Sequence, residues 1–300
     1  MSPRYSLERQ AVRRAFDRAA LSYDSGAGLQ REVASRMAER LQYVKLAPAR
    51  VLDLGCGTGA DLALLAQAYP EARRIGCDWS TAMLRRARDR VPRLKRLLPL
   101  LGLGMPQLVC AEASALPLRS GSIGFVWSNQ MLHWLDDPGP ALREILRVLD
   151  VGGLFMFSTL GPDTLKELRQ AFARDPGPHV HNFDDMHDVG DLLVACGFAD
   201  PVMDMETITL TYPDVNALVQ DLRRTGATNR TVQRRRGLTG SVLWQGARDA
   251  YETFRRDGRL PATFEVIYGH AWKPQPRLSD DGRAIVRFDP GRRGRALGRP

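Results

Sequence analysis

Long apolar runs are missing from this sequence. No stretch approaches the roughly 20 consecutive apolar residues that a membrane helix needs. The N-terminus also lacks the apolar core and small-residue cleavage site of a secretory signal. Arginine is frequent there, as in transit peptides, but Glu8, Asp17 and Asp24 are unusual in such peptides, which contain few acids. We therefore expect a cytoplasmic protein that does not span a membrane.

Cysteine is scarce as well. The four cysteines, Cys56, Cys77, Cys110 and Cys196, are far apart, and none belongs to a paired zinc-binding spacing. The first three lie in or beside expected core strands, so we expect reduced thiols that pack as small apolar side chains. Nothing in the sequence requires a metal.

The chain is basic, with a formal net charge of +9. Part of this charge lies in residues 274–300, where arginines alternate with glycines, a composition that predicts a disordered basic tail. A second basic run extends from Arg223 and Arg224 through Arg230 to Arg236, within the part expected to fold. This run could meet an acidic partner, or it could be a solvated surface.

Residues 1–45 have a helical pattern. We expect one helix near residues 9–20, a turn-rich break at 22–26 and a second helix near 29–44. Four apolar residues of the second helix recur at every fourth position, which is typical of a helix that packs on a core. We interpret the segment as an N-terminal helical cap.

Residues 46–273 alternate between short apolar runs and helical stretches, which is typical of βαβ units around a parallel sheet. We expect strands near 50–54, 73–77, 107–110, 123–127, 152–158, 202–212 and 264–272, and helices near 60–69, 80–90, 139–149, 164–173 and 184–196. The pair Gly152-Gly153 is expected to end the third of these helices. The pattern predicts a Rossmann-like α/β fold, with a seven-stranded, mostly parallel sheet and helices on both faces.

The last two expected strands are separated by residues 213–258, which contain two helical stretches and the basic run. Insertions of this length between neighbouring strands are more often functional than decorative. We expect a helical lid.

The strongest motif is the segment Asp53 to Gly59, Asp-Leu-Gly-Cys-Gly-Thr-Gly, at the end of the first strand. Gly55, Gly57 and Gly59 allow a tight turn and close contact between backbone and ligand. A dinucleotide site would read G-x-G-x-x-G. Asp53 would also repel a pyrophosphate, whereas it suits an ammonium and a sulfonium group. We expect S-adenosylmethionine as the ligand, with Asp53 acting through water or backbone amides.

Three further polar residues stand at the ends of expected strands. Asp78 closes the second strand 19 residues after Gly59, where its carboxylate could accept hydrogen bonds from both ribose hydroxyls. Glu112 follows the third strand as a partner for an adenine amino group, and Asn129 ends the fourth strand facing the same crevice. Each could instead cap the turn or helix that follows.

The segment Asp53 to Gly59, together with Leu116-Pro117, resembles class I S-adenosylmethionine-dependent methyltransferases. More specifically, residues 15–24 and 29–33 resemble the N-terminus of the malonyl-[acyl-carrier protein] O-methyltransferases of biotin synthesis. The resemblance continues through 127–134, 158–165, 222–229 and 261–268, and so spans most of residues 11–273. It implies transfer of a methyl group from S-adenosylmethionine, the methyl donor, to the free carboxylate of malonyl-acyl carrier protein, an acidic protein.

Such a reaction needs no general base, because a carboxylate with a pKa of about 4 is already ionised at neutral pH. In-line placement in a water-poor pocket would carry the catalysis. We hypothesise that Tyr23 and His133 face this pocket and that Arg223 or Arg224 binds one oxygen of the substrate carboxylate. Alternatively, His133 packs behind the fourth strand and the arginines lie on the surface.

Other functions remain open at this stage. A mitochondrial group with similar motifs is associated with arginine hydroxylation, so an assembly factor that modifies a protein arginine is one alternative. The positive charge is also compatible with an RNA methyltransferase. The sequence lacks a basic strand interleaved with aromatic residues, which makes nucleic acid the less favoured partner.

Overall fold

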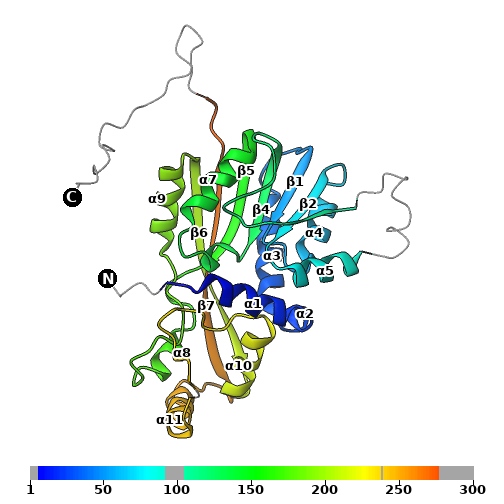
Figure 1. Ribbon diagram of the computed structural model, residues 1–300. Coiled ribbons are helices and arrows are strands. Elements are labelled where there is room, and N and C mark those ends of the chain that lie inside the picture. Colours follow the sequence, from blue (N-terminus) through cyan, green and yellow to red (C-terminus); the bar gives the residue numbers. More distant parts are fainter. Residues whose placement is uncertain (1–5, 92–104, 238, 277–300) are drawn as a thin grey trace, which may run out of the picture.

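The computed structural model describes residues 6–91, 105–237 and 239–276, in one α/β unit (Figure 1). The basic tail expected from residue 274 onward lies outside the described residues, apart from its first three. Within the described ranges, no helix has both the length and the apolar composition needed to cross a bilayer.

A seven-stranded sheet runs through the molecule in the order β3-β2-β1-β4-β5-β7-β6. Strands β1 to β5 are parallel, whereas β7 pairs antiparallel with both β5 and β6. This arrangement confirms the predicted Rossmann-like, mostly parallel sheet. The strands are β1 (Arg50–Leu54), β2 (Arg73–Asp78), β3 (Gln107–Cys110), β4 (Ile123–Asn129), β5 (Leu149–Leu160), β6 (Ala199–Tyr212) and β7 (Leu260–Trp272).

Helices cover both faces of the sheet because successive strand residues point to opposite sides. Phe125 and Trp127 of β4 pack with α3 (Gly28–Leu41) and α4 (Ala60–Ala68), whereas Val126 packs with α7 (Gly139–Val148) and α9 (Met186–Cys196). Helix α5 (Thr81–Arg90) follows β2, and a 3₁₀ turn, η2 (Leu132–Trp134), follows β4.

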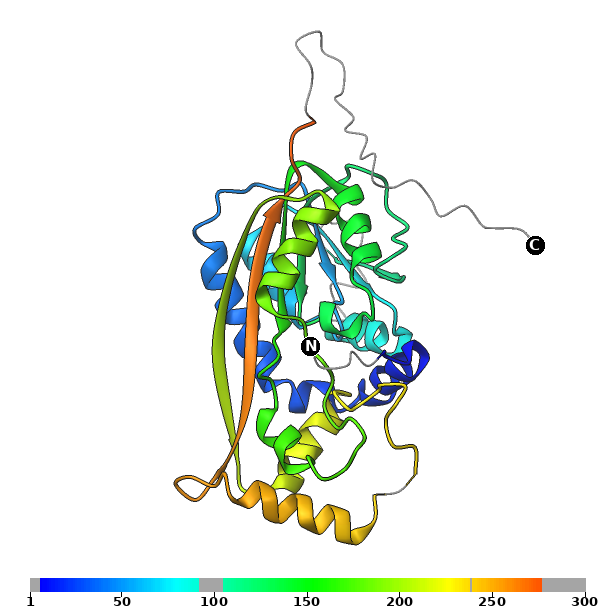
Figure 2. The ribbon, with the colours of Figure 1, turned by 90° about the vertical axis from the view of Figure 1, so that its left-hand side faces the viewer.

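The remaining helices gather at one end of the sheet. Helix α8 (Lys166–Ala171) lies against α11 (Ser241–Glu252), and α10 (Val215–Arg224) lies beside the N-terminal helices. The long strands β6 and β7 extend toward this end (Figure 2). Helices α10 and α11 are the two helices expected between the last two strands.

The N-terminal segment contains three helices rather than two. Between α1 (Arg9–Ala19) and α3, the expected turn-rich break at 22–26 is a one-turn helix, α2 (Tyr23–Gly26). Glycine and serine favour turns in isolation, but here Ser22 Oγ donates to the Arg224 carbonyl oxygen at 3.0 Å. Contact with the end of α10 therefore replaces the local preference.

The expectation that Gly152-Gly153 ends a helix is wrong. Helix α7 ends at Val148, and β5 begins at Leu149, so both glycines lie inside β5. The Gly152 amide donates to the Lys273 carbonyl, and the Lys273 amide donates to the Gly153 carbonyl, both at 2.9 Å. Pairing with the chain beyond β7 thus extends the strand across glycines that would otherwise weaken it.

The cysteines only partly match their expected role as core residues. Cys56 and Cys77 are buried, Cys196 is half-buried, and all four thiols are free. Cys110 is exposed, because it ends β3, which is the edge strand of the sheet. Its expected packing as a core side chain is therefore wrong.

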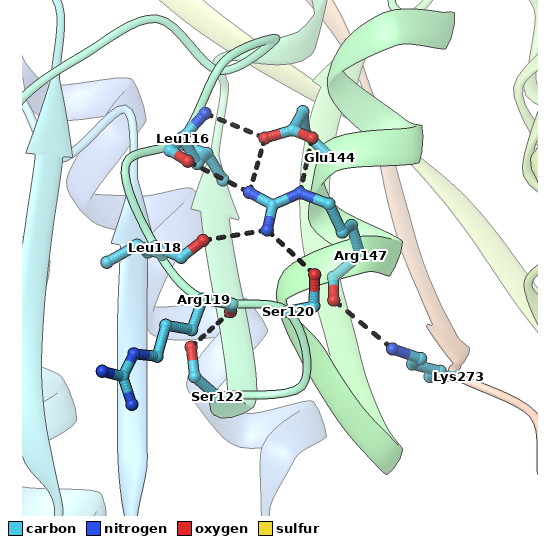
Figure 3. Close-up of polar contacts among 8 residues, drawn as sticks. All are labelled: Leu116, Leu118, Arg119, Ser120, Ser122, Glu144, Arg147 and Lys273. Atoms are coloured by element: carbon cyan, nitrogen blue, oxygen red, sulfur yellow. Dashed lines mark hydrogen bonds and ion pairs between the residues drawn. The ribbon is translucent and has the colours of Figure 1, made fainter.

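The Leu116-Pro117 segment is held to α7 by hydrogen bonds to Arg147 and Glu144, two residues of α7 that also form an ion pair with each other (Figure 3). Arg147 forms a bidentate pair with Glu144 at 2.7 and 2.8 Å, and it donates to the carbonyl oxygens of Leu116 at 3.0 Å and Leu118 at 2.9 Å. The Leu116 amide donates to Glu144 at 2.9 Å. This network fixes the loop that connects β3 to β4.

We expect Arg147→Lys to lower the free energy of unfolding by about 2 kcal/mol, because an ammonium group cannot reproduce the planar fork that reaches several acceptors at once. Urea unfolding at neutral pH measures this change. Arg143→Lys, an exposed residue on the same helix, is the matched control and should change stability by less than about 0.5 kcal/mol. Equal effects of the two substitutions would contradict the structural role of the fork.

Candidate functional site

One large cavity, of about 660 Å³, opens where the parallel strands end. Gly55 and Gly57 line it after β1, Asp78 at the end of β2, Glu112 after β3 and Asn129 at the end of β4. Ligands of open α/β sheets bind at the carboxyl ends of the strands, and this volume is typical of small-molecule sites. The structure thus brings five of the seven residues predicted to bind the methyl donor onto one cavity wall.

The three glycines of the turn have different reasons to be glycine. All have positive φ angles, +81° at Gly55, +50° at Gly57 and +76° at Gly59. A Cβ on Gly55 would lie 2.6 Å from Met131 Cγ, and one on Gly59 would lie 2.9 Å from Ala87 Cβ. A Cβ on Gly57 would have no atom of the other described residues within 4 Å, its two chain neighbours aside. Gly57 therefore leaves open space where a ligand can approach the backbone.

Asp78 is fixed in place by backbone amides. Its carboxylate accepts hydrogen bonds from the amides of Gly57 at 2.9 Å and Ser80 at 2.8 Å. Burial raises the pKa of Asp78 to about 6, although these bonds oppose the shift. The carboxylate faces the cavity and also shapes the turn, so its ligand-binding and structural interpretations are compatible.

A second carboxylate near the turn, half-buried, is Asp61, which the sequence reasoning missed. Asp61 accepts hydrogen bonds from Trp127 Nε1 at 2.9 Å and Asn129 Nδ2 at 3.0 Å. Burial raises the pKa of Asp61. The available signal was an acid two residues after Gly59, in the first turn of a helix.

Asp53 lies behind the cavity wall and is almost completely buried, with an exposed fraction of 1%. Burial, followed by the charges of Asp61 and Asp78, raises the pKa of Asp53 well above its usual value. Its Oδ2 has no hydrogen-bond partner among the described residues. Three carboxylates so close together create a negative potential that favours a cationic ligand such as a sulfonium or an ammonium group.

Asn129 and Glu112 already have protein partners. Asn129 Nδ2 donates to Asp61 and to the Gln30 carbonyl oxygen, both at 3.0 Å, and its Oδ1 accepts from Ser158 Oγ at 2.9 Å. Asn129 therefore joins α3, β4 and β5 at the cavity wall. Glu112 forms an ion pair with Arg9 of α1, which lines the same cavity.

Two aspartates attach the N-terminal helices to the glycine turn and to the segment that follows β2. Asp24 accepts hydrogen bonds from Thr58 Oγ1 and Arg90 Nη2, both at 2.6 Å. Asp17 accepts from Ser80 Oγ, also at 2.6 Å. Sequence reasoning treated both aspartates as part of a motif, without assigning them these links.

Three of the four residues predicted to act on the substrate reach the same cavity. Tyr23, His133 and Arg223 line it. Arg224 is not among the lining residues, and its guanidinium is 3.3 Å from Asp221 Oδ1. The structure therefore brings Arg223, and not Arg224, to the cavity.

His133 and Tyr23 are uncharged at neutral pH. Burial, with a smaller contribution from His181, lowers the pKa of His133 to about 3. Burial and the nearby charges of Asp61 and Asp78 raise the pKa of Tyr23 above its usual value. His133 Nδ1 is buried without a partner among the described residues. Both side chains can therefore serve a ligand through neutral polar groups.

The end of the cavity away from the glycine turn is mostly apolar. Its walls come from α8 and the segments around it, from β6 and β7, and from α10 and α11. The apolar lining residues are Leu160, Leu165, Leu168, Phe172, Val180, Phe183, Leu210, Val219, Leu222, Trp244 and Phe264. Such a lining excludes water and strengthens electrostatic interactions inside the cavity.

Two sequence motifs interlock behind this apolar wall. The Asp163 amide donates to Glu265 Oε2 at 2.7 Å, and the Thr263 amide donates to Glu167 Oε2 at 3.1 Å. A Cβ on Gly161 would lie 2.5 Å from the Glu265 carboxyl carbon. The segments 161–165 and 261–265 thus hold α8 against β7 and position the cavity wall.

The basic run is partly used in internal contacts. Arg234 pairs with Glu8 at 2.8 Å, and Arg235 pairs with Asp175 at 3.0 Å. The Val232 amide donates to the Ser6 carbonyl at 2.8 Å. These contacts tie the segment between α10 and α11 to the N-terminus and to the loop after α8, so the run is more than a solvated surface.

The strand order, the open space at Gly57 and the buried acids at the ends of β1 and β2 define a class I S-adenosylmethionine-dependent methyltransferase. A family model described as a methyltransferase domain matches residues 52–157. Solved structures share the fold. A putative methyltransferase in complex with the Haloferax volcanii Trm112 activator has a TM-score of 0.56 at 17% identity, covering 89% of this chain and 100% of its own. The YcgJ protein of Bacillus subtilis has a TM-score of 0.53 at 20% identity, covering 82% and 99%.

Closer relatives are found among proteins named malonyl-[acyl-carrier protein] O-methyltransferase. The one from Laribacter hongkongensis is 53% identical over 97% of this chain and 99% of its own length. That from Gallionella capsiferriformans is 51% identical over 94% and 97%. The chain belongs to the malonyl-[acyl-carrier protein] O-methyltransferase family, which confirms the resemblance seen in the sequence, and S-adenosylmethionine is its methyl donor.

Proposed function

We propose that this enzyme transfers a methyl group from S-adenosylmethionine to the free carboxylate of malonyl-acyl carrier protein in the cytoplasm. The products are S-adenosylhomocysteine and the malonyl methyl ester that primes pimeloyl synthesis on the route to biotin. The observation that carries this proposal is that one continuous cavity joins the acidic glycine turn to an apolar end that is lined by Arg223. Relatives that are about half identical over nearly the whole chain carry the corresponding name.

Residues around the turn are suited to hold the methyl donor. The backbone at Gly55 and Gly57 offers close contact, Asp78 suits the ribose hydroxyls, and Glu112 suits the adenine amino group. Asp53 acts indirectly, through the turn backbone and the local negative potential. The donor supplies a methyl group activated by a positively charged sulfur.

The chain needs to orient the substrate more than to activate it. A malonyl carboxylate is ionised at neutral pH, so no side chain has to remove a proton. Arg223 would bind one carboxylate oxygen, and the neutral Tyr23 and His133 would complete the polar lining without repelling the sulfonium. The other oxygen stays free to attack.

Exclusion of water should accelerate this reaction, because two opposite charges neutralise each other as the methyl group moves. We infer that residues 1–45 form a cap and that residues 213–258 form a lid on a methyltransferase domain of residues 46–273. The contacts of Asp17 and Asp24 with the turn, and those of α10 and α11 with the apolar end, support this division.

Transfer of labelled methyl from S-adenosylmethionine to purified malonyl-acyl carrier protein tests the proposal. The acetyl form, which lacks the free carboxylate, is the control. We expect base-labile label on the malonyl form alone. Intact donor binding with no label on the malonyl form would overturn the proposal. Label on RNA would then indicate an RNA methyltransferase, whereas hydroxylation of a protein arginine transfers no methyl group and would be detected as an added oxygen by mass spectrometry.

A further inference from the structure

An arginine-rich surface lies at one edge of the cavity, where α1 meets the segment after α10. The Glu8 amide donates to the Arg230 carbonyl at 2.8 Å, and Leu7 forms a β-bridge with Thr231. Gly226 packs so closely on α1 that a Cβ there would lie 3.2 Å from Ala19 Cβ. In Figure 1, α10 lies near α1 and α2, and it contacts α2 directly. Segments more than 200 residues apart thus form one surface.

Positive charge on this surface exceeds the negative charge paired with it. We call Arg14, Arg18, Arg230, Arg234 and Arg236 the rim arginines. Three of them share one carboxylate, Glu8, at distances of 3.4, 2.8 and 3.7 Å. The other two, Arg18 and Arg230, form no ion pair among the described residues.

Arg230 in particular lacks a partner. Its Nε is buried and has no hydrogen-bond partner among the described residues. Burial lowers the pKa of Arg230, and the charges of Arg18, Arg234 and Arg14 lower it further, whereas the charge of Glu8 opposes the shift. A guanidinium that is partly desolvated and surrounded by like charges favours an anion that can accept several hydrogen bonds.

The rim arginines stand beside the cavity. Thr228 and Asn229, which directly precede Arg230, line it. The Arg230 amide donates to Nε2 of His181 at 2.9 Å, and His181 lines the cavity as well. Arg18 of α1 lies close enough to Arg230 for its charge to lower the pKa of Arg230. An anion held by Arg18 and Arg230 would therefore lie at the cavity edge.

We propose that Arg18 and Arg230 bind the phosphodiester of the phosphopantetheine arm on which the carrier protein presents its acyl group. This inference rests on the proposed function. The arm has a phosphate at its protein end and a thioester at its other end, so a cationic edge and an apolar interior match its two ends. The more exposed Arg14 and Arg236 face the acidic carrier protein itself and steer its approach.

The test compares two small substrates, malonyl-phosphopantetheine and malonyl-pantetheine, which differ only in the phosphate. We expect wild-type enzyme to favour the phosphorylated form in kcat/KM by about tenfold to a hundredfold, the value of one or two charged hydrogen bonds. Arg18→Ala and Arg230→Ala should each reduce this ratio, and the double variant should bring it close to one. Arg13→Ala, an exposed residue of the same helix, should keep the wild-type ratio.

The outcomes separate this inference from the proposed function. Methylation of both thioesters with equal kcat/KM by wild-type enzyme would overturn the phosphate site alone. A phosphate preference that persists in the double variant would also overturn it. If the enzyme methylates neither of the two thioesters nor malonyl-acyl carrier protein, the proposed function is overturned, and the inference with it. Because Arg18 is exposed on a helix, its single variant tests the site even if Arg230→Ala fails to fold.

Discussion

Asp78→Asn is expected to weaken S-adenosylmethionine binding about a hundredfold and to make the stability of the donor-free protein less dependent on pH. The affinity falls because an amide oxygen replaces a charged acceptor for two ribose hydroxyls, at about 1.5 kcal/mol or more for each bond. Equilibrium dialysis or calorimetry with S-adenosylmethionine measures this loss. If the variant binds S-adenosylmethionine as tightly as wild type does, Asp78 does not bind the donor.

The stability effect of Asp78→Asn should depend on pH. The folded-state pKa of Asp78 is about 6, above the usual 3.8, so the folded protein holds this proton more tightly than the unfolded chain does. The resulting destabilisation is absent below about pH 4, grows as the pH rises to about 6 and is then constant, at roughly 3 kcal/mol. Asparagine does not titrate, so the variant lacks this pH-dependent destabilisation.

Urea unfolding of wild type and variant at pH 4 and pH 7 tests this expectation. The variant should gain stability relative to wild type between the two pH values. Asp191→Asn, which removes one exposed carboxylate from α9, is the matched control for the change in charge. An equal difference at both pH values would show that Asp78 does not carry the cost of burial inferred here.

Arg223→Ala is expected to raise KM for malonyl-acyl carrier protein about thirtyfold and to leave S-adenosylmethionine affinity unchanged. Loss of a charged hydrogen bond to the substrate carboxylate, worth about 2 kcal/mol, explains this size. Steady-state kinetics with both substrates varied measures it. Arg224→Ala is the matched control, because Arg224 is not among the cavity-lining residues and its guanidinium is already paired with Asp221, so KM should change less than threefold. An unchanged KM in Arg223→Ala would show that Arg223 does not bind the substrate carboxylate.

The sheet and the donor turn were predictable because their signals are local. Apolar runs that alternate with helical stretches specify βαβ units, and a glycine turn after a strand carries its own steric reason. The predicted ribose acid, Asp78, stands at the cavity because the strands of a parallel sheet end at one edge. None of these inferences required knowledge of distant contacts.

The features that sequence reasoning missed depend on contacts between distant segments. Asp61 gains its role from Trp127 and Asn129, more than 60 residues away. Gly152 continues a strand because of pairing with Lys273, against its local preference for a turn. Arg223 and Arg224 are neighbours in sequence, and only the packing of α10 decides which one lines the cavity. Burial and pairing of this kind have no local pattern.

Helix α1 touches two parts of the site at once. Through Asp17 it is bonded to Ser80 beside the donor pocket, and through Arg18 it contributes to the arginine-rich edge. If the carrier protein docks on this helix as we propose, it would hold the donor pocket closed beneath it. The two substrates would then bind in a fixed sequence, donor first and carrier second, and demethylated donor would leave only after the carrier departs.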